Sequence, residues 1–274
     1  MIVELKIRDE EVELILQDLM QLHGYDFTSY SQASLKRRLN RLLLLDRFPS
    51  FAEMRYRIQS DKDYLRRVVE EITVNVTEMF RDPSFFQMLR TEIFPRLAAK
   101  PFIRVWHAGC STGEEVYSVA IILKELKLLH KSLLYATDLN PDVVQKASRG
   151  FFPLGAMKQH SENYIQAGGK EEFSKYYTAK YNHVVFDEDL RKRMIFSTHN
   201  LVSDSSFNEF QIILCRNVFI YFDKVLQDRV LRLFNDSLEP LGYIGLGSKE
   251  TLKFSDIGKR YKQQGREKIW QKVQ

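Results

Sequence analysis

The residues best suited to chemistry lie in one short stretch, VWHAGCSTGEEVYSVAII at residues 105–122. A strand-like apolar segment runs through Gly109 and Gly113 into an apolar segment with helical spacing, and Glu114 and Glu115 stand where the helix would begin. Glycines at such a junction let the backbone approach a ligand closely. The two acids would repel a pyrophosphate but would attract a positively charged amino acid end. The stretch therefore indicates a binding loop for a ligand without phosphate.

The next acidic landmark is Asp138, which ends the apolar run LLYATD. An acid at the tip of the second strand of a βαβ unit can accept hydrogen bonds from both ribose hydroxyls. The stretch lacks the GxGxxG pattern of a dinucleotide fold. S-adenosylmethionine fits better, since it carries a ribose, an ammonium and a sulfonium but no phosphate. The alternative is a purely structural junction, in which Glu114 and Glu115 face solvent and complement the helix dipole.

The two halves of the chain differ in hydrophobic periodicity. Residues 9 to about 98 place apolar side chains at helical spacing, and from Phe102 short apolar runs alternate with helical stretches. Strands buried on both faces have the latter pattern, which predicts an α/β domain with a mainly parallel sheet. Three runs end in polar residues, at Asp138, Asn200 and Arg216-Asn217, where open α/β sheets bind ligands.

These patterns predict the domain organisation. We expect an all-helical N-terminal domain at 1–80, a linker helix at 81–100 that Pro95 bends or interrupts, and an α/β domain at 101–274. The alternation lapses around residues 168–195, which predicts a small antiparallel β insertion there.

Composition narrows the class of protein. A chain of 274 residues with 44% hydrophobic and 28% charged residues is typical of a globular protein with room for two domains. The net charge of +5 favours acidic partners. We expect no membrane insertion, because no apolar run has the required length, and no signal peptide, so the expected location is the cytoplasm. Cys110 and Cys215 are expected as buried free thiols. His107 and His199 lack metal-ligand spacing, so we expect no metal.

Several motifs together identify a resemblance. The segments ITVNVTEMFRDPSFF, HAGCSTGEEVYSVAI, ATDLNPDVVQKASRGFF, HNL and ILCRNVFIYFDK, in this order, resemble the chemotaxis receptor methyltransferase (CheR) family over nearly the whole chain. The resemblance implies a Rossmann-like class I methyltransferase domain. It also implies a protein-glutamate O-methyltransferase, which transfers methyl groups from S-adenosyl-L-methionine to glutamate carboxylates of chemoreceptors and leaves S-adenosyl-L-homocysteine. This activity serves chemotaxis signal transduction.

The resemblance also implies roles for individual residues. Arg81 and Tyr221 would lie nearest the transferred methyl group. The residues that would contact the cofactor are Asn75, Thr77, Arg81, Glu115, Asp138, Asn200, Leu201, Asn217 and Val218. For Arg81 the alternative is a surface salt bridge to Asp82 or Glu78, and Tyr221 has the alternative of a core aromatic residue. The chain departs from the family pattern at Val116 (usually proline), at Leu241 (commonly glycine) and at Ser248-Lys249 (usually His-Ser).

The implied reaction suits these residues. A glutamate side chain is already ionised at pH 7, so a methyl transfer to it needs positioning rather than a general base. Arg81 could orient the acceptor carboxylate through its paired N–H donors.

The implied partners are the cytoplasmic methylation helices of chemoreceptors, which would meet a basic helix at 35–47 and the β insertion. A solvated helix face is the alternative for that basic helix. It lacks the interleaved aromatic residues of a nucleic-acid site, so we expect no nucleic acid, and we expect a monomer. The compact loop AKYNHVVFDED suggests an enzyme that works without a receptor-tail pentapeptide. The rival functions are methyl transfer to another acceptor and a non-catalytic, cofactor-sensing interaction module.

Overall fold

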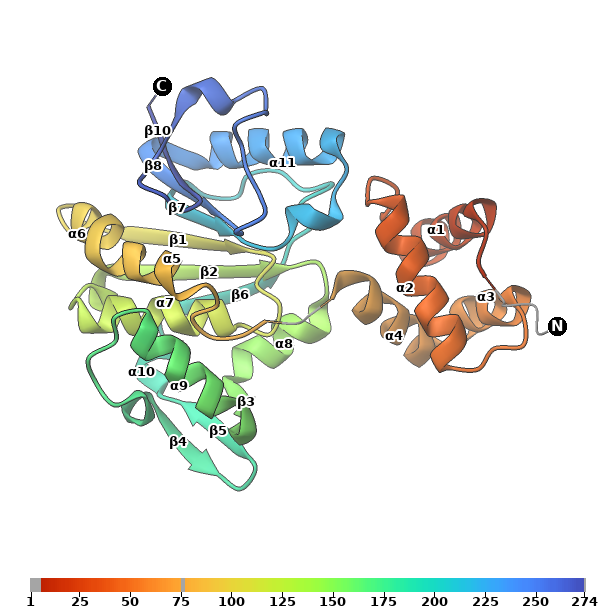
Figure 1. Cartoon of the computed structure of the whole chain (residues 1–274), viewed down its shortest axis with the longest axis horizontal. Helices are drawn as coiled ribbons and strands as arrows, with labels where there is room; N and C mark the ends of the chain where they lie inside the picture. Colours follow the sequence, from red (N-terminus) through yellow and green to blue (C-terminus); the bar gives the residue numbers. More distant parts are fainter. Residues whose placement is uncertain (1–5, 75–76, 274) are drawn as a thin grey trace. The chain divides into compact units, whose positions relative to one another are not determined.

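The computed structural model describes residues 6–74 and 77–273. Its contacts divide the chain into two compact units. One unit comprises Met1–Asn75 together with Tyr221–Gln227, and the other comprises Val76–Ile220 together with Asp228–Gln274 (Figure 1). Because Tyr221–Gln227 belongs to the first unit, the chain returns to that unit shortly after the CRN motif. The predicted boundaries at 80 and 100 stay predictions.

The first unit is helical, as the periodicity predicts. Its helices are α1 (Asp9–His23), α2 (Gln32–Leu45), α3 (Phe51–Ser60) and α4 (Lys62–Thr73). The leucine stripe of α2 is buried, at Leu35, Leu39, Leu42 and Leu43. Side-chain oxygens cap two of the helices, since Ser50 accepts the Glu53 N–H and Asp61 accepts the Tyr64 N–H. Apolar stripes and caps together account for this bundle.

The second unit is built on a seven-stranded sheet with strand order β6-β2-β1-β7-β8-β10-β9. The strands are β1 (Ile103–Ala108), β2 (Ser132–Asp138), β6 (Met194–Thr198), β7 (Phe210–Cys215), β8 (Leu238–Leu246), β9 (Tyr261–Gln263) and β10 (Ile269–Lys272). The pairs from β6 to β8 are parallel, and β10 is antiparallel to both of its neighbours. The predicted α/β fold class with a mainly parallel sheet is confirmed.

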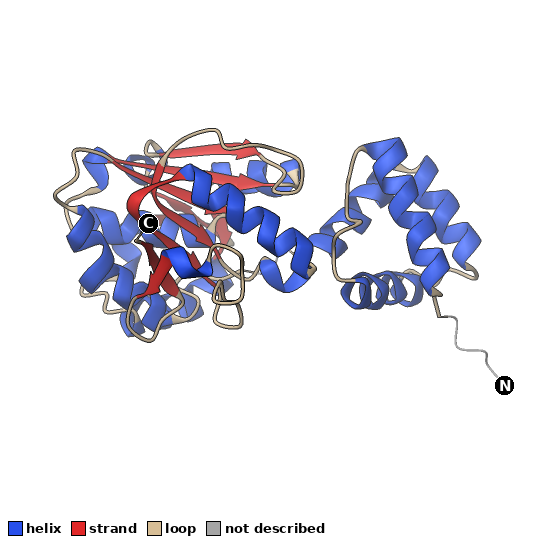
Figure 2. Cartoon of the chain, turned by 90° about the horizontal axis from the view of Figure 1, so that it is seen from above, coloured by secondary structure: helices blue, strands red, loops and turns tan. Residues whose placement is uncertain are grey.

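Helices cover the sheet on both faces (Figure 2). Residues of α7 (Glu114–Glu125) share one core with β1 and β2, and α5 (Pro83–Met88) contributes to the same core. On the other face Phe234 of α11 (Lys224–Ser237) packs 5.3 Å from the Trp106 ring. α5 begins at Pro83, and ahead of Pro95 the helix changes to the π-helical η1 (Leu89–Ile93) before α6 (Phe94–Leu97), which agrees with the predicted interruption.

The β insertion is a three-stranded antiparallel sheet, β3-β5-β4, which confirms the predicted small antiparallel insertion, although β3 lies ahead of the expected range of 168–195. Its strands are β3 (Phe151–Pro153), β4 (Tyr177–Lys180) and β5 (His183–Phe186), and α8 (Pro141–Arg149), α9 (Met157–Gln166) and α10 (Glu188–Arg191) flank them. The Glu125 carboxylate at the end of α7 pairs with Arg90 and accepts hydrogen bonds from Tyr164 and Tyr176. This half-buried carboxylate ties the insertion to α7.

Across residues 6–74 and 77–273, no helix combines the length and the apolar character that a membrane crossing requires. Cys110 and Cys215 are buried free thiols, as expected.

Candidate functional site

Parallel pairing brings the predicted strand ends to one edge of the sheet. Asp138 is the last residue of β2, and Asn200 and Asn217 follow the ends of β6 and β7 by two residues each. Gly109 directly follows β1. Because β6, β2, β1 and β7 run in the same direction, all four positions lie at the carboxyl edge. This edge is where open α/β sheets bind ligands.

The β1–α7 loop depends on two glycines. Gly109 has φ 81°, and a Cβ there would lie 2.6 Å from Cγ2 of Val218. Gly113 has φ 96°, and a Cβ there would lie 2.9 Å from Cβ of Ala147. Both positions need glycine for conformation and for space. The first brings the loop against the Asn217-Val218 segment, so two predicted cofactor-contacting segments touch.

Asp138 is held by backbone donors. Its Oδ2 accepts the Ser111 N–H at 2.9 Å and its Oδ1 accepts the Asn140 N–H at 3.1 Å. Burial raises the pKa of the Asp138 carboxyl, and these N–H groups oppose that shift. A carboxylate oxygen has two lone pairs, so each oxygen keeps one for a hydroxyl. Within the described residues the buried Ser111 Oγ has no partner. A diol such as a ribose fits these groups.

Glu115 lies between two donors. Its Oε1 is 2.8 Å from Nδ1 of His107, and its Oε2 accepts a hydrogen bond from Arg216 at 3.2 Å. Burial alone would raise the pKa of Glu115, but the hydrogen bonds and charges of His107 and Arg216 outweigh it, so the pKa lies below its usual value. Glu115 is therefore a carboxylate at neutral pH and can accept a further hydrogen bond from a cationic ligand.

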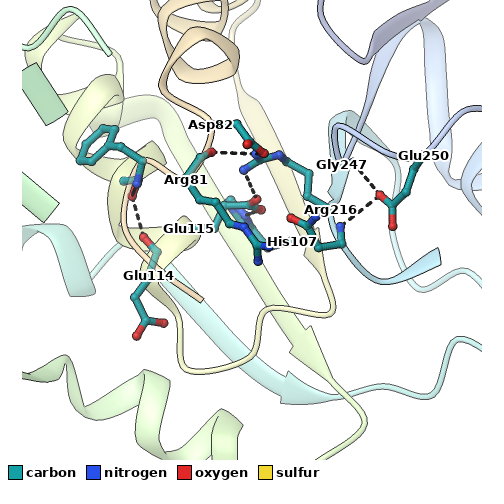
Figure 3. Close-up of polar contacts among 11 residues, drawn as sticks. Arg81, Asp82, His107, Glu114, Glu115, Arg216, Gly247 and Glu250 are labelled. Carbon is teal, nitrogen blue, oxygen red and sulfur yellow. Dashed lines mark hydrogen bonds and ion pairs between the residues drawn. The ribbon is translucent and has the colours of Figure 1, made fainter. Parts of the chain in front are cut away.

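Arg216 joins three segments of the α/β unit. Its side chain is 3% exposed and donates at 2.7 Å both to the backbone carbonyl of Arg81 and to the Asp82 carboxylate, besides its bond to Glu115 (Figure 3). Its guanidinium also lies 4.2 Å from the centre of the Phe85 ring. Arg216, which follows the end of β7, thus contacts both residues 81–82 and the first turn of α7.

The segment around Arg81 is also anchored to α7. The Phe80 N–H donates to Oγ of Ser118 at 3.0 Å, and Ser118 donates to the Glu114 carbonyl at 2.7 Å. Phe80 and Asp82 have φ of 54° and 59°, in a region that side-chain-bearing residues adopt only at a cost of about 1–3 kcal/mol. The hydrogen bond that Ser118 accepts from Phe80 and those that Arg216 donates stabilise that conformation. Thr77 is half-buried, and Asn75 lies outside the described residues.

Glu250 supports the Asn217 segment. Its Oε2 accepts the N–H groups of Asn217 at 3.0 Å and Gly247 at 2.6 Å (Figure 3). Its Oε1 accepts the Ile220 N–H at 3.3 Å. Burial raises the pKa of Glu250, and the N–H donors oppose that shift. Lys249, which departs from the family pattern, directly precedes Glu250 in the chain, and its side chain is exposed.

Glu114 and Glu115 have different environments. The Glu114 carboxylate points away from the Arg216 cluster (Figure 3). It accepts a hydrogen bond from Thr112 at 2.7 Å. Glu114 is 8% exposed, and burial raises its pKa to about 7. The interpretation of the two acids as solvent-facing residues of a helix start is therefore wrong.

Tyr221 belongs to the helical unit. The Arg38 guanidinium of α2 lies 5.2 Å from the centre of the Tyr221 ring, and the Ser31 N–H donates to the Tyr221 carbonyl at 2.8 Å. Tyr221 is half-buried rather than a core residue. In the α/β unit, Asn200 caps its own turn through the Val202 N–H, and Leu201 is buried.

Sequence reasoning missed four contributors to the site: His107 as a partner of Glu115, Ser118, Arg216 as a connector, and Glu250. Arg216 carried a signal, since a cation directly after the buried run FQIILC needs a partner. Glu250 carried none, because its donors are backbone groups that only the folded chain brings together.

Two family models together match most of the chain. The family model for the SAM-binding domain of CheR methyltransferases matches residues 75–269, and the model for the all-alpha CheR domain matches residues 10–73. A Pseudomonas putida protein named as methyltransferase Cher3 is 43% identical over 92% of this chain and 93% of its own length. The chemotaxis protein methyltransferase of Listeria innocua is 30% identical over 86% of this chain and 88% of its own.

Solved structures are less similar to this chain in sequence. The glycopeptide N-methyltransferase MtfA, complexed with S-adenosyl-L-methionine, covers 58% of this chain and 53% of its own at 14% identity, with a TM-score of 0.35. The sequence relatives are therefore the informative comparison.

Proposed function

Since the chain belongs to the CheR methyltransferase family, we propose that it methylates glutamate side-chain carboxylates of chemoreceptors to γ-glutamyl methyl esters. The observation that carries the proposal is the Arg216 cluster, because it joins three of the five sequence motifs of the family resemblance at the carboxyl edge of the sheet. The enzyme would act in the cytoplasm, on the methylation helices of receptors.

The cofactor is S-adenosyl-L-methionine, which the matched family domain binds. It supplies an electrophilic methyl group carried on a sulfonium. Asp138 would accept hydrogen bonds from the ribose hydroxyls, and the ionised Glu115 would accept the ammonium. The other contacts are assigned to Asn75, Thr77, Arg81, Asn200, Leu201, Asn217 and Val218. The glycine-dependent contact of the β1–α7 loop with Val218 supports this set.

Arg81 is the proposed orienting residue for the acceptor carboxylate. Its backbone is fixed by the bond from Arg216 to the Arg81 carbonyl and by the neighbouring bond from Phe80 to Ser118. A guanidinium carried on this backbone can hold a carboxylate through two N–H groups without protonating it. Positioning of this kind contributes several kcal/mol to a displacement. No general base is required, because the acceptor is already ionised.

Tyr221 is the second residue proposed near the transferred methyl group. Its ring contacts the guanidinium of Arg38 in α2, and both residues belong to the helical unit. Burial lowers the pKa of Arg38, although its ring contact and the hydrogen bond to the Glu71 carbonyl keep the cation in place. Arg38 thus holds Tyr221 rather than facing a receptor.

The receptor would meet two basic surfaces. On α2 and the turn after it, Arg37, Arg41 and Arg47 are exposed, and Arg41 alone of these three pairs with an acid within the described residues, Glu71 at 2.9 Å. On the β insertion, a cleft of about 320 Å³ is lined by Lys146, Arg149, Phe151, Lys180, His183 and Val185, with no acid among them. Both surfaces suit the acidic methylation helices, and we propose that the enzyme docks there as a monomer.

A methyl-transfer assay tests the proposal. The protein is incubated with tritiated cofactor and a receptor cytoplasmic fragment, and the label is then released with mild base. We expect base-labile label, and a loss of about a hundredfold in rate for Arg81→Ala. Arg96→Ala removes a half-exposed arginine paired with Glu92 and should leave the rate unchanged. Base-stable label would assign the methyl group to an amine or a nucleobase and contradict carboxyl methylation.

A further inference from the structure

A second cleft lies at the opposite end of the main sheet from Asp138. It includes the first residues of β1 and β2, Ile103 and Ser132, and Arg193, which directly precedes β6. Its volume is about 240 Å³. Its lining residues are Phe102, Ile103, Arg104, His130, Lys131, Ser132, Leu133 and Arg193. The cleft is therefore separate from the cofactor site, which lies at the carboxyl ends of the same strands.

Two cations of this cleft are held in place by neutral groups. The Lys131 ammonium donates to the carbonyls of Ala98 at 2.6 Å and Lys100 at 2.9 Å. The Arg104 guanidinium donates to the Glu209 carbonyl at 3.2 Å. A carbonyl oxygen fixes a cation without cancelling its charge. Both side chains are thus preorganised and remain positive.

The third cation, Arg193, has no partner among the described residues. The Arg193 side chain is half-buried and makes no hydrogen bond or ion pair with any residue in the part of the chain that the structure describes. None of its guanidinium nitrogens is among the buried atoms that lack a partner, so they stay open to solvent and to a ligand. The cleft thus gathers three permanent positive charges and one imidazole, His130, and none of its lining residues is acidic. This composition favours an anion with more than one negative charge.

The cleft also has an apolar wall. Phe102 is 65% exposed and stands beside Ile103 and the half-buried Leu133. The volume lies below the range of about 300–1,000 Å³ that holds drug-sized ligands, which excludes a whole dinucleotide. We propose that this cleft binds a small phosphate monoester, with its phosphate among Arg193, Arg104 and Lys131 and its organic part against Phe102. Arginine suits phosphate because its N–H fork matches two phosphate oxygens.

Calorimetric titration of the full-length protein with inorganic phosphate and with phenyl phosphate, in a phosphate-free buffer of fixed ionic strength, tests this site. We expect both probes to bind, and phenyl phosphate to bind about tenfold more tightly because its ring covers Phe102. Phe102→Ala should remove that difference. Arg193→Gln should weaken both probes about tenfold or more, because a charge-assisted hydrogen bond is lost.

Lys192→Gln is the matched control, since it removes the same charge one residue away, from an exposed side chain that pairs with Glu188 at 3.2 Å. It should bind both probes like the wild type. Thermal unfolding and S-adenosyl-L-homocysteine affinity, both unchanged, would show that the variants are folded. Equal binding by Arg193→Gln and wild type, or an equal loss in Lys192→Gln, would overturn the site. Equal affinities of the wild type for the two probes would overturn the assignment of the organic part to Phe102.

Discussion

Replacement of Arg216 by methionine tests the structural basis of the site. The side chain is 3% exposed, and its removal leaves Glu115 with His107 as its remaining partner and Asp82 without its ion pair. Breaking a buried pair costs about 3–5 kcal/mol when a charge stays buried. The Asp82 side chain is 37% exposed and can be rehydrated, which reduces that cost. We expect the free energy of unfolding to fall by about 3 kcal/mol, within the total of about 5–15 kcal/mol for a typical domain.

The same substitution should weaken cofactor binding. Without Arg216, residues 81 and 82 lose their anchor and must be ordered when the ligand binds. Ordering costs about 1–2 kcal/mol per residue, so the affinity for S-adenosyl-L-homocysteine should fall at least about tenfold. Arg216→Lys keeps the charge but not the fork that reaches Arg81, Asp82 and Glu115, and should give intermediate values in both assays.

Urea unfolding and calorimetric titration measure these two quantities. Arg232→Met is the matched control, because Arg232 forms an ion pair of similar length with Asp256 on an exposed surface, worth about 0–1 kcal/mol. A variant Arg216→Met that unfolds at the same urea concentration as the wild type and binds the product equally well would refute the assignment of Arg216 as a positioning residue.

Three further outcomes follow from particular residues. The pKa of Glu114 is raised to about 7, so the folded protein favours its protonated form, and the free energy of unfolding should fall by up to about 3 kcal/mol as the pH rises from about 4.5 to about 7. Unfolding titrations at several pH values should show that Glu114→Gln lacks this pH-dependent component of stability. An identical pH profile for the variant and the wild type would contradict the prediction. Leu241 has φ 64° and is 61% exposed where the family commonly has glycine, so Leu241→Gly should stabilise the protein by about 1 kcal/mol, and a lower unfolding midpoint would contradict this. A receptor-tail pentapeptide should show no micromolar binding in a calorimetric titration, since we expect the enzyme to work without it, and saturable binding that Lys180→Glu on the β insertion abolishes would refute this expectation.

The parts of the site that could be predicted from the sequence depend on local sequence pattern and on strand topology. Asp138 and Asn217 end or follow apolar runs, and parallel strands place such ends at one edge, so their convergence follows from pattern and topology alone. Gly109 and Gly113 were recognisable because a strand–helix turn needs left-handed backbone.

The missed contributors depend on distant parts of the chain. Arg216 meets Asp82 across 134 residues, and Glu250 meets Asn217 across 33. A backbone N–H gives no signal in a sequence, so a carboxylate that serves it cannot be found by pattern. The different environments of Glu114 and Glu115 likewise arise from which side of α7 each faces, which depends on packing rather than on residue type.

The most direct test of the central claim is calorimetric titration of S-adenosyl-L-homocysteine into the wild type and Asp138→Ala. Asp138 is fixed by two backbone N–H groups at the carboxyl edge and is assigned the ribose hydroxyls. We predict micromolar binding to the wild type and its loss, by about a hundredfold, in the variant, since two hydrogen bonds to a charged acceptor are removed. No binding to the wild type, or equal binding to both proteins, would contradict the account of this site.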